Sequence, residues 1–191
     1  MPKNGYFKAE GLNIGWVGKI RNNRNFGIIG QGNWTRLSSF KILFMKDGRN
    51  EIAIKRLNLA KRYLENAKED LKKAGIDKRA NRYIDLKYIS KASGTAYLGA
   101  LEALKALFIF KNLVSDEEVK DKFKKVEEFH KGLKSIKSLG KDRDLLLSLF
   151  DDVYNILHLG GYYRELQSKK AIDDGFEKVE KIIKIVESYV K

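Results

Sequence analysis

The sequence predicts an all-α protein: an antiparallel bundle of about five helices over residues 51–191, after an irregular or weakly β extension over residues 1–50. Three observations lead to this prediction. Apolar residues recur at steps of three and four throughout the second segment, which is the period of an amphipathic helix. Pro2 is the only proline, so none interrupts a helix downstream. Glycines such as Gly75 and Gly140 separate the periodic stretches, where they can end a helix.

Residues 1–50 differ in composition from the rest of the chain. They are rich in glycine, asparagine and aromatic residues, and they show no lasting helical period. Two short apolar runs, residues 16–20 and 26–29, are candidate strands joined by an asparagine-rich turn. Met45 stands just before the regular pattern begins. One hypothesis is that the natural domain starts near Met45 and that residues 1–44 are an upstream extension.

The first two expected helices span about residues 51–74 and 86–111, with a polar connection between them. The apolar stripe of the first consists of Leu57, Ala60, Leu64, Ala67, Leu71 and Ala74. The second is the most apolar stretch of the chain and is rich in alanine and glycine. Small residues let neighbouring helices approach closely, so we expect this helix at the centre of the bundle.

Three further helices follow in the second half of the chain. The third is expected to begin at Ser115, because a serine followed by three acidic residues is a strong helix start, and to end before Gly140. The fourth should end at the Gly160-Gly161 pair, and the fifth covers about residues 172–190. Short joints between amphipathic helices favour an antiparallel bundle.

The net charge of +14 makes the protein basic, with 39 Lys and Arg against 25 Asp and Glu. Residues 1–44 hold seven basic residues and one acidic residue, and the remainder holds 32 and 24. In the remainder the two signs alternate, which favours a solvated helix surface over a nucleic-acid interface. There is no cysteine, which excludes disulfides and thiolate metal sites. We see no secretory signal and no apolar span of about 20 residues, so we expect a cytoplasmic protein without a membrane partner.

Two stretches have a distinctive pattern: residues 60–75, AKRYLENAKEDLKKAG, and residues 92–107, ASGTAYLGALEALKAL. They resemble the first and the second helix of HEPN domains (higher eukaryotes and prokaryotes nucleotide-binding). Residues 51–191 are also similar to a group of uncharacterised bacterial proteins of this shape. That group shares a Tyr-x-x-Leu-His-Leu-x-Gly-Tyr-Tyr run, here Tyr154 to Tyr163.

The HEPN resemblance implies a bundle that often forms homodimers. It implies either a ribonuclease of a toxin–antitoxin or defence system, or a non-catalytic partner of a nucleotidyltransferase-like protein. HEPN ribonucleases carry an arginine four to six residues before a histidine. Here His130 has no arginine in that range, and Arg143 precedes His158 by fifteen residues. The expectation is therefore a non-catalytic, homodimeric binding or accessory module, with RNA left open as a partner.

The end of the fourth expected helix is the best candidate for chemistry. Asp151, Tyr154 or Asn155, and His158 are three or four residues apart, which would place them on one helix face. A carboxylate beside an imidazole raises its basicity, as a general base needs. The candidate catalytic residues are His158, Asp151, Arg164 and Tyr162, and the candidate ligand-binding residues are Tyr154, Asn155, His158, Tyr162 and Tyr163. The plainer interpretation is that His158 forms a hydrogen bond within a seam of the bundle while the tyrosines fill the end of the core.

Other chemistries find less support. The run from Glu127 to His130 has the Glu-x-x-His spacing of di-metal bundles, but such bundles need two copies, so we expect no metal and no cofactor. Two alternatives to the binding module stay open. One is a metal-independent ribonuclease that uses His158 with Arg143 or Arg164 and Tyr162. The other is a bundle that serves only as a structural partner of another protein.

Overall fold

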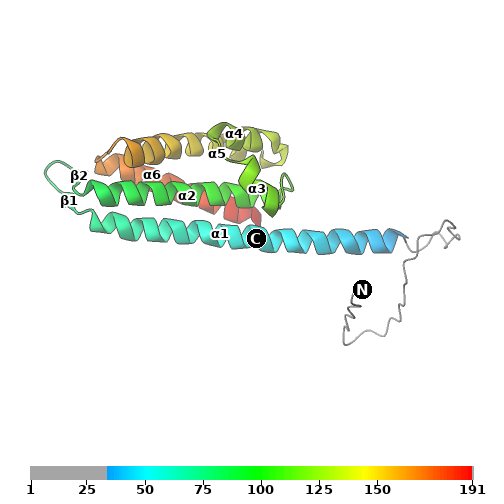
Figure 1. Cartoon of the computed structure of the whole chain (residues 1–191). Coiled ribbons are helices and arrows are strands. Elements are labelled where there is room, and N and C mark those ends of the chain that lie inside the picture. The colour runs from blue at the N-terminus through cyan, green and yellow to red at the C-terminus, as the bar shows by residue number, and fades with distance from the viewer. Residues whose placement is uncertain (1–33, 191) are drawn as a thin grey trace, which may run out of the picture.

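The computed structural model describes residues 34–190, and side chains from residue 48 onward. Within this range the chain forms six α-helices and a two-stranded sheet, so the all-α prediction is confirmed. The helices are α1 (Trp34–Lys73), α2 (Leu86–Phe110), α3 (Asp116–Lys122), α4 (Val126–Ser135), α5 (Lys141–Val153) and α6 (Lys169–Val190). A 3-10 turn, η1 (Lys137–Leu139), and a π-helix, η2 (Tyr154–Tyr163), complete them. Figure 1 shows the long helices side by side, with α3 and α4 at one end of the bundle.

The first helix is longer than the sequence predicted. It begins at Trp34 and not near Glu51, so residues 34–50, which were expected in the irregular extension, are helical. At 40 residues α1 is about 60 Å long, and its N-terminal part projects past the bundle (Figure 1). Gly48 does not stop it, because a single glycine in a helix costs only about 1 kcal/mol relative to alanine. The candidate strands at residues 16–20 and 26–29 lie outside the described residues.

The connection between α1 and α2 is more ordered than a plain polar loop. Strands β1 (Ile76–Asp77) and β2 (Arg82–Tyr83) pair antiparallel, with Ile76 opposite Tyr83. The carboxylate of Asp77 accepts hydrogen bonds from the backbone N–H groups of Arg79 and Ala80, which closes the turn. Figure 1 shows this hairpin at the end of the bundle opposite to α3 and α4.

The third predicted helix is divided into α3, α4 and η1. Ser115 starts it with a full capping box, as expected, because its side chain accepts from Glu118 N–H and the Glu118 carboxylate accepts from Ser115 N–H. The helix then ends at Phe123, whose backbone leaves the helical region (φ −117°, ψ 73°). A second start follows, in which the Glu128 carboxylate accepts from the N–H groups of Lys124 and Lys125. The sequence carried only half of a capping signal here, Glu128, because the N-cap position is occupied by Lys125 and not by a residue such as Ser or Thr.

Helix α2 is the centre of the bundle, as predicted. Its small residues lie buried inside the chain: Ala92, Ser93, Ala96, Gly99, Ala100 and Ala103. A Cβ atom on Gly99 would lie 3.1 Å from the carbonyl oxygen of Ala60, so α1 passes very close to this position. These residues explain packing within one chain and therefore no longer argue for a dimer; the oligomeric state stays a prediction.

An ion-pair network ties three helices together. Arg56 on α1 binds Glu102 on α2 at 2.7 Å and Asp116 on α3 at 2.6 Å. The side chains of Arg56 and Glu102 are only 12% and 13% exposed, and Lys105 binds the same glutamate at 2.9 Å. Among the described residues, no helix combines the length and apolar character that crossing a membrane requires.

Candidate functional site

The fourth predicted helix continues beyond Val153 but changes its winding. Tyr154–Tyr163 form a π-helix, in which each N–H bonds to the carbonyl five residues earlier. The helix was expected to end at Gly160-Gly161; instead both glycines lie inside the wider winding. Because residues four and five apart then lie above one another, Tyr154, His158 and the Tyr162-Tyr163 pair share one side of η2.

Close contact with α2 explains why glycine occupies Gly161. A Cβ atom there would lie 2.2 Å from Ser93 Oγ and 2.6 Å from Ser93 Cβ. The hydroxyl of Ser93 is itself buried and has no hydrogen-bond partner among the described residues. On the outer side, the ring of Tyr162 lies over Gly94, where a Cβ atom would be 3.0 Å from it. Together Gly94 and Gly161 let η2 lie directly on α2.

Five rings meet at this contact, which we call the tyrosine–histidine cluster: Tyr97, Tyr154, His158, Tyr162 and Tyr163. The imidazole of His158 is at the centre. Its centroid lies 4.4 Å from that of Tyr97, with the two rings stacked. The centroids of Tyr154 and Tyr163 lie 5.3 Å and 5.0 Å away. Tyr162 lies 6.0 Å away with its ring nearly parallel to the imidazole.

The solvent exposure of the rings increases from one side of the cluster to the other. Tyr97 is 7% exposed and forms the floor, whereas Tyr162 and Tyr163 are 45% and 64% exposed. Burial lowers the pKa of His158 below its ordinary value, and burial raises the pKa of Tyr97. Both changes keep the rings uncharged near neutral pH. The surface is therefore aromatic and neutral at its centre.

Asp151 lies elsewhere, which corrects the prediction that it shares a helix face with His158. Its Oδ1 atom is 2.7 Å from Nε2 of His130 on α4, although the contact lacks the alignment of a hydrogen bond. His130 also lies edge-on to Phe150. The prediction was wrong because it assumed one regular α-helix through these residues. Asp151 precedes the change of winding, and it faces α4 while His158 faces α2.

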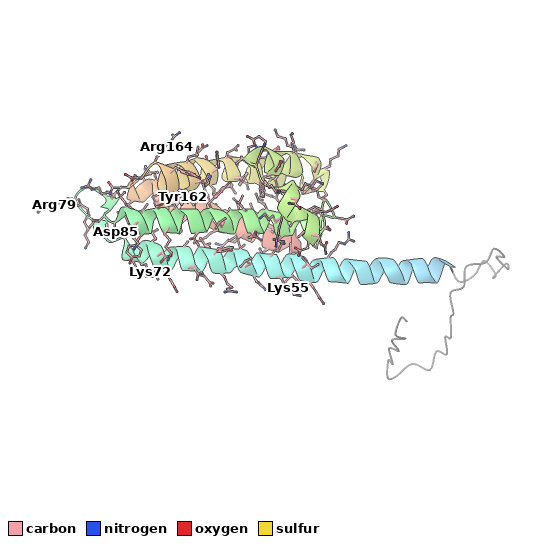
Figure 2. All side chains as sticks on the ribbon, in the orientation of Figure 1. Lys55, Lys72, Arg79, Asp85, Tyr162 and Arg164 are labelled. Carbon is pink, nitrogen blue, oxygen red and sulfur yellow. The ribbon has the colours of Figure 1, made fainter. Side chains whose placement is uncertain are left out.

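The remaining candidates are not assembled around His158 either. Arg164 is exposed, and Figure 2 shows it at the outer surface while Tyr162 lies between η2 and α2. Arg143 binds its neighbour Asp144 at 2.9 Å. Asn155 is exposed. Of the four candidate catalytic residues, only His158 and Tyr162 are in contact.

Sequence reasoning missed Tyr97, which comes from a different helix. The available signal was an isolated aromatic residue inside the small-residue run of α2, where it must either pack on a neighbour or be exposed. It also missed Ser90, whose hydroxyl donates to the carbonyl of Tyr162 at 3.2 Å. Over residues 48–190 no group of three or more His, Asp or Glu side chains is placed to hold a metal ion.

The chemical capacity of the cluster follows from these contacts. A general base works best with a partner that orients it, and no carboxylate contacts His158 among the described side chains. Exposed aromatic faces beside a neutral imidazole suit a different task, which is to stack on a planar group. Stacking on a planar group is therefore the capacity that these contacts give the cluster.

Comparison with known proteins gives a family and a structural relative. Residues 55–188 match the model of a family described as a domain of unknown function, DUF5618. A protein of unknown function from Dyadobacter fermentans has a similar solved structure, with 31% sequence identity and a TM-score of 0.56. The similarity covers 73% of this chain and 98% of that chain. No curated protein matches the chain. The predicted similarity to a family of uncharacterised proteins is thereby confirmed.

Proposed function

The chain belongs to the DUF5618 family, and from that premise we propose that it is a non-catalytic binding module which holds a planar, ring-bearing ligand at the tyrosine–histidine cluster. One observation carries this proposal: two tyrosines that are 45% and 64% exposed lie in ring contact with each other and with a half-buried histidine. Large exposed aromatic groups gathered in one place mark interaction surfaces. Stacking of one base on an aromatic side chain contributes about 1–3 kcal/mol.

The charge of the protein favours an acidic ligand. The net charge is +14, and Arg164 lies exposed directly after Tyr162 and Tyr163. A guanidinium group suits phosphate, because its planar array of donors matches two phosphate oxygens. A ligand that combines a planar ring with a phosphate group would use both features.

The separation of Asp151 from His158 supports a non-catalytic role. A ribonuclease that used His158 would need a second group to stabilise charge, and Arg143 is engaged with Asp144. The resemblance of residues 60–75 and 92–107 to HEPN helices supports the narrower proposal that this is an HEPN-like accessory module. A nucleotidyltransferase-like protein is its proposed partner on the same ground.

A labelled single-stranded RNA of twelve nucleotides tests the proposal, because it carries both rings and phosphates. We expect the full chain to bind this RNA without cleaving it. Tyr162→Ala should weaken binding about tenfold, since one stacking partner is lost. Tyr63→Ala is the control, because Tyr63 is a partly exposed tyrosine on α1 that makes none of the cluster's ring contacts.

Three outcomes would contradict the proposal. Cleavage that disappears in His158→Ala would indicate the ribonuclease. Equal weakening by Tyr162→Ala and Tyr63→Ala would show that the cluster is not the site. Absence of binding to the RNA and to free ATP by the folded protein would leave the bundle as a structural partner of another protein.

A further inference from the structure

A hollow lies at the opposite end of the bundle from the hairpin, between α3 and α4. We call it the α3–α4 pocket. Its volume is about 360 Å³, and it is lined by Leu113, Lys122, Phe123, Glu128, Lys131, Gly132 and Ser135. This volume is within the range of small-molecule sites, at its lower end. None of these residues belongs to the tyrosine–histidine cluster.

The floor of the pocket is a fixed aromatic surface. Gly132 has no side chain, so the rings of Phe108 and Phe123 lie against its backbone; a Cβ atom there would be 2.9 Å from each ring. The two rings stack at 4.5 Å, and Phe129 contacts both. Phe123 is only 5% exposed. The floor is therefore apolar and is held in place by the core.

The rim of the pocket carries two ammonium groups. Lys122 Nζ donates to the carbonyl of Leu113 at 3.3 Å, which holds this charge at the rim. Lys131 is exposed, and its charge lies close enough to Glu128 to contribute to lowering the pKa of that carboxyl. Ser135 is occupied, because its hydroxyl donates to the carbonyl of Gly132 at 2.7 Å.

Glu128 is the acidic group in the lining, and the start of α4 already engages it. Its carboxylate accepts from the N–H groups of Lys125 and Lys124, at 2.9 Å and 2.7 Å. These two hydrogen bonds lower the pKa of Glu128, and the charges of Lys125 and Lys131 lower it further. Its negative charge is thus directed at the helix start, where the helix dipole is positive. An anion at the lysine side of the rim meets less repulsion for this reason.

We propose that the α3–α4 pocket binds a small amphipathic carboxylate. Its apolar part would lie on Leu113 and Phe123, and its carboxylate would bridge the ammonium groups of Lys122 and Lys131. A site with an apolar floor and a cationic rim selects this class, because an uncharged apolar molecule leaves the lysines unused and a small hydrophilic anion leaves the floor exposed to water. This proposal does not depend on the function assigned to the cluster.

Octanoate is the probe. Octanol and acetate are the matched compounds, because octanol retains the apolar chain without the carboxylate and acetate retains the carboxylate without the chain. Two-dimensional NMR of the full chain follows the amides of residues 113, 123 and 132. We expect octanoate to shift these amides to saturation, and to bind at least about tenfold more tightly than octanol or acetate, since the two lysine contacts and the apolar contact act together. Comparable affinity for octanol, or no saturable shift with octanoate, would overturn the proposal.

Charge reversal at one lysine distinguishes a direct contact with the lysines of the pocket rim from a general effect of the net charge of the protein. Lys131→Glu should weaken octanoate binding about fivefold, the upper end of what loss of an exposed ion pair produces. Lys134→Glu is the matched control, because Lys134 is exposed on the same helix but lies outside the pocket. If Lys131→Glu disturbs α4, Lys131→Gln serves the same comparison. Equal effects at the two positions would refute the assigned binding mode.

Discussion

The contact between Gly161 and Ser93 makes the strongest test of the structure. In Gly161→Ala the new methyl group would lie 2.2 Å from Ser93 Oγ and 2.6 Å from Ser93 Cβ. The hydroxyl can rotate away, but the Cβ atom is fixed to the backbone of α2. A normal carbon–carbon contact of about 3.5 Å therefore requires η2 to move from α2 by about 1 Å.

The expected cost follows from this forced movement. Overpacking of a filled core costs about 1–3 kcal/mol, and this clash is severe enough for the upper end of that range. Replacing a helical glycine by alanine returns about 1 kcal/mol through helix propensity. The net loss in the free energy of unfolding should be about 2 kcal/mol, which corresponds to a fall in Tm of about 4–8 °C for a chain of this size.

Urea and thermal unfolding followed by circular dichroism measure this loss, and a double-mutant cycle assigns its cause. In a Ser93→Gly background both clashing atoms are absent, so Gly161→Ala should no longer destabilise, and the coupling energy should be about 2 kcal/mol. Gly48→Ala is the control, because no atom lies within 4 Å of the added methyl group. The reasoning is refuted if Gly161→Ala leaves Tm unchanged, or if it costs the same in both backgrounds.

Three further predictions concern charge and assembly. Burial lowers the pKa of His158, so below its ordinary pKa the unfolded chain binds a proton that the folded state does not. The free energy of unfolding should therefore fall as the pH drops below about 6.5, and it should level off below the folded-state pKa. His158→Gln should remove that part of the pH dependence, and an identical slope in both proteins would contradict this. Arg56→Ala should lower the free energy of unfolding by about 2–4 kcal/mol, because it leaves the nearly buried carboxylate of Glu102 with one partner fewer. Lys124→Ala removes an exposed ion pair and should change the free energy of unfolding by less than about 0.5 kcal/mol. Similar losses in the two variants would count against a special role for the buried network. The HEPN resemblance predicts a homodimer, which light scattering at micromolar concentration would measure, and a monomer mass would reject it.

Local signals in the sequence were sufficient to locate the helical stretches, although not all of their boundaries. The period of Leu57 to Ala74 depends only on 3.6 residues per turn, and the Ser115 cap depends on groups three residues apart. The central place of α2 followed from its composition, because a helix that is apolar on most sides must be buried. The start of α1 was misjudged, since helix propensity alone continues through residues that have no apolar period.

The sequence predicted the residues of the candidate site that are close together along the chain, but not those that come from other helices. The aromatic run from Tyr154 to Tyr163 is visible in the sequence, and four of the five rings in the cluster come from it. The fifth ring, Tyr97, could not be assigned to the cluster from the sequence, because it comes from α2 and only the folding of the bundle brings it near. The contact of Asp151 with His130 on α4 was hidden for the same reason.

The sequence by itself thus determined the fold class, the central helix and the aromatic composition of the candidate site. Only the tertiary structure decided how that site is arranged. The close contact between η2 and α2 depends on Gly161 of η2 and Gly94 of α2, and across it His158 lies against Tyr97 while Asp151 lies against His130. An α-helical period is a local property of the backbone, whereas a π-helix is stabilised by what packs against it.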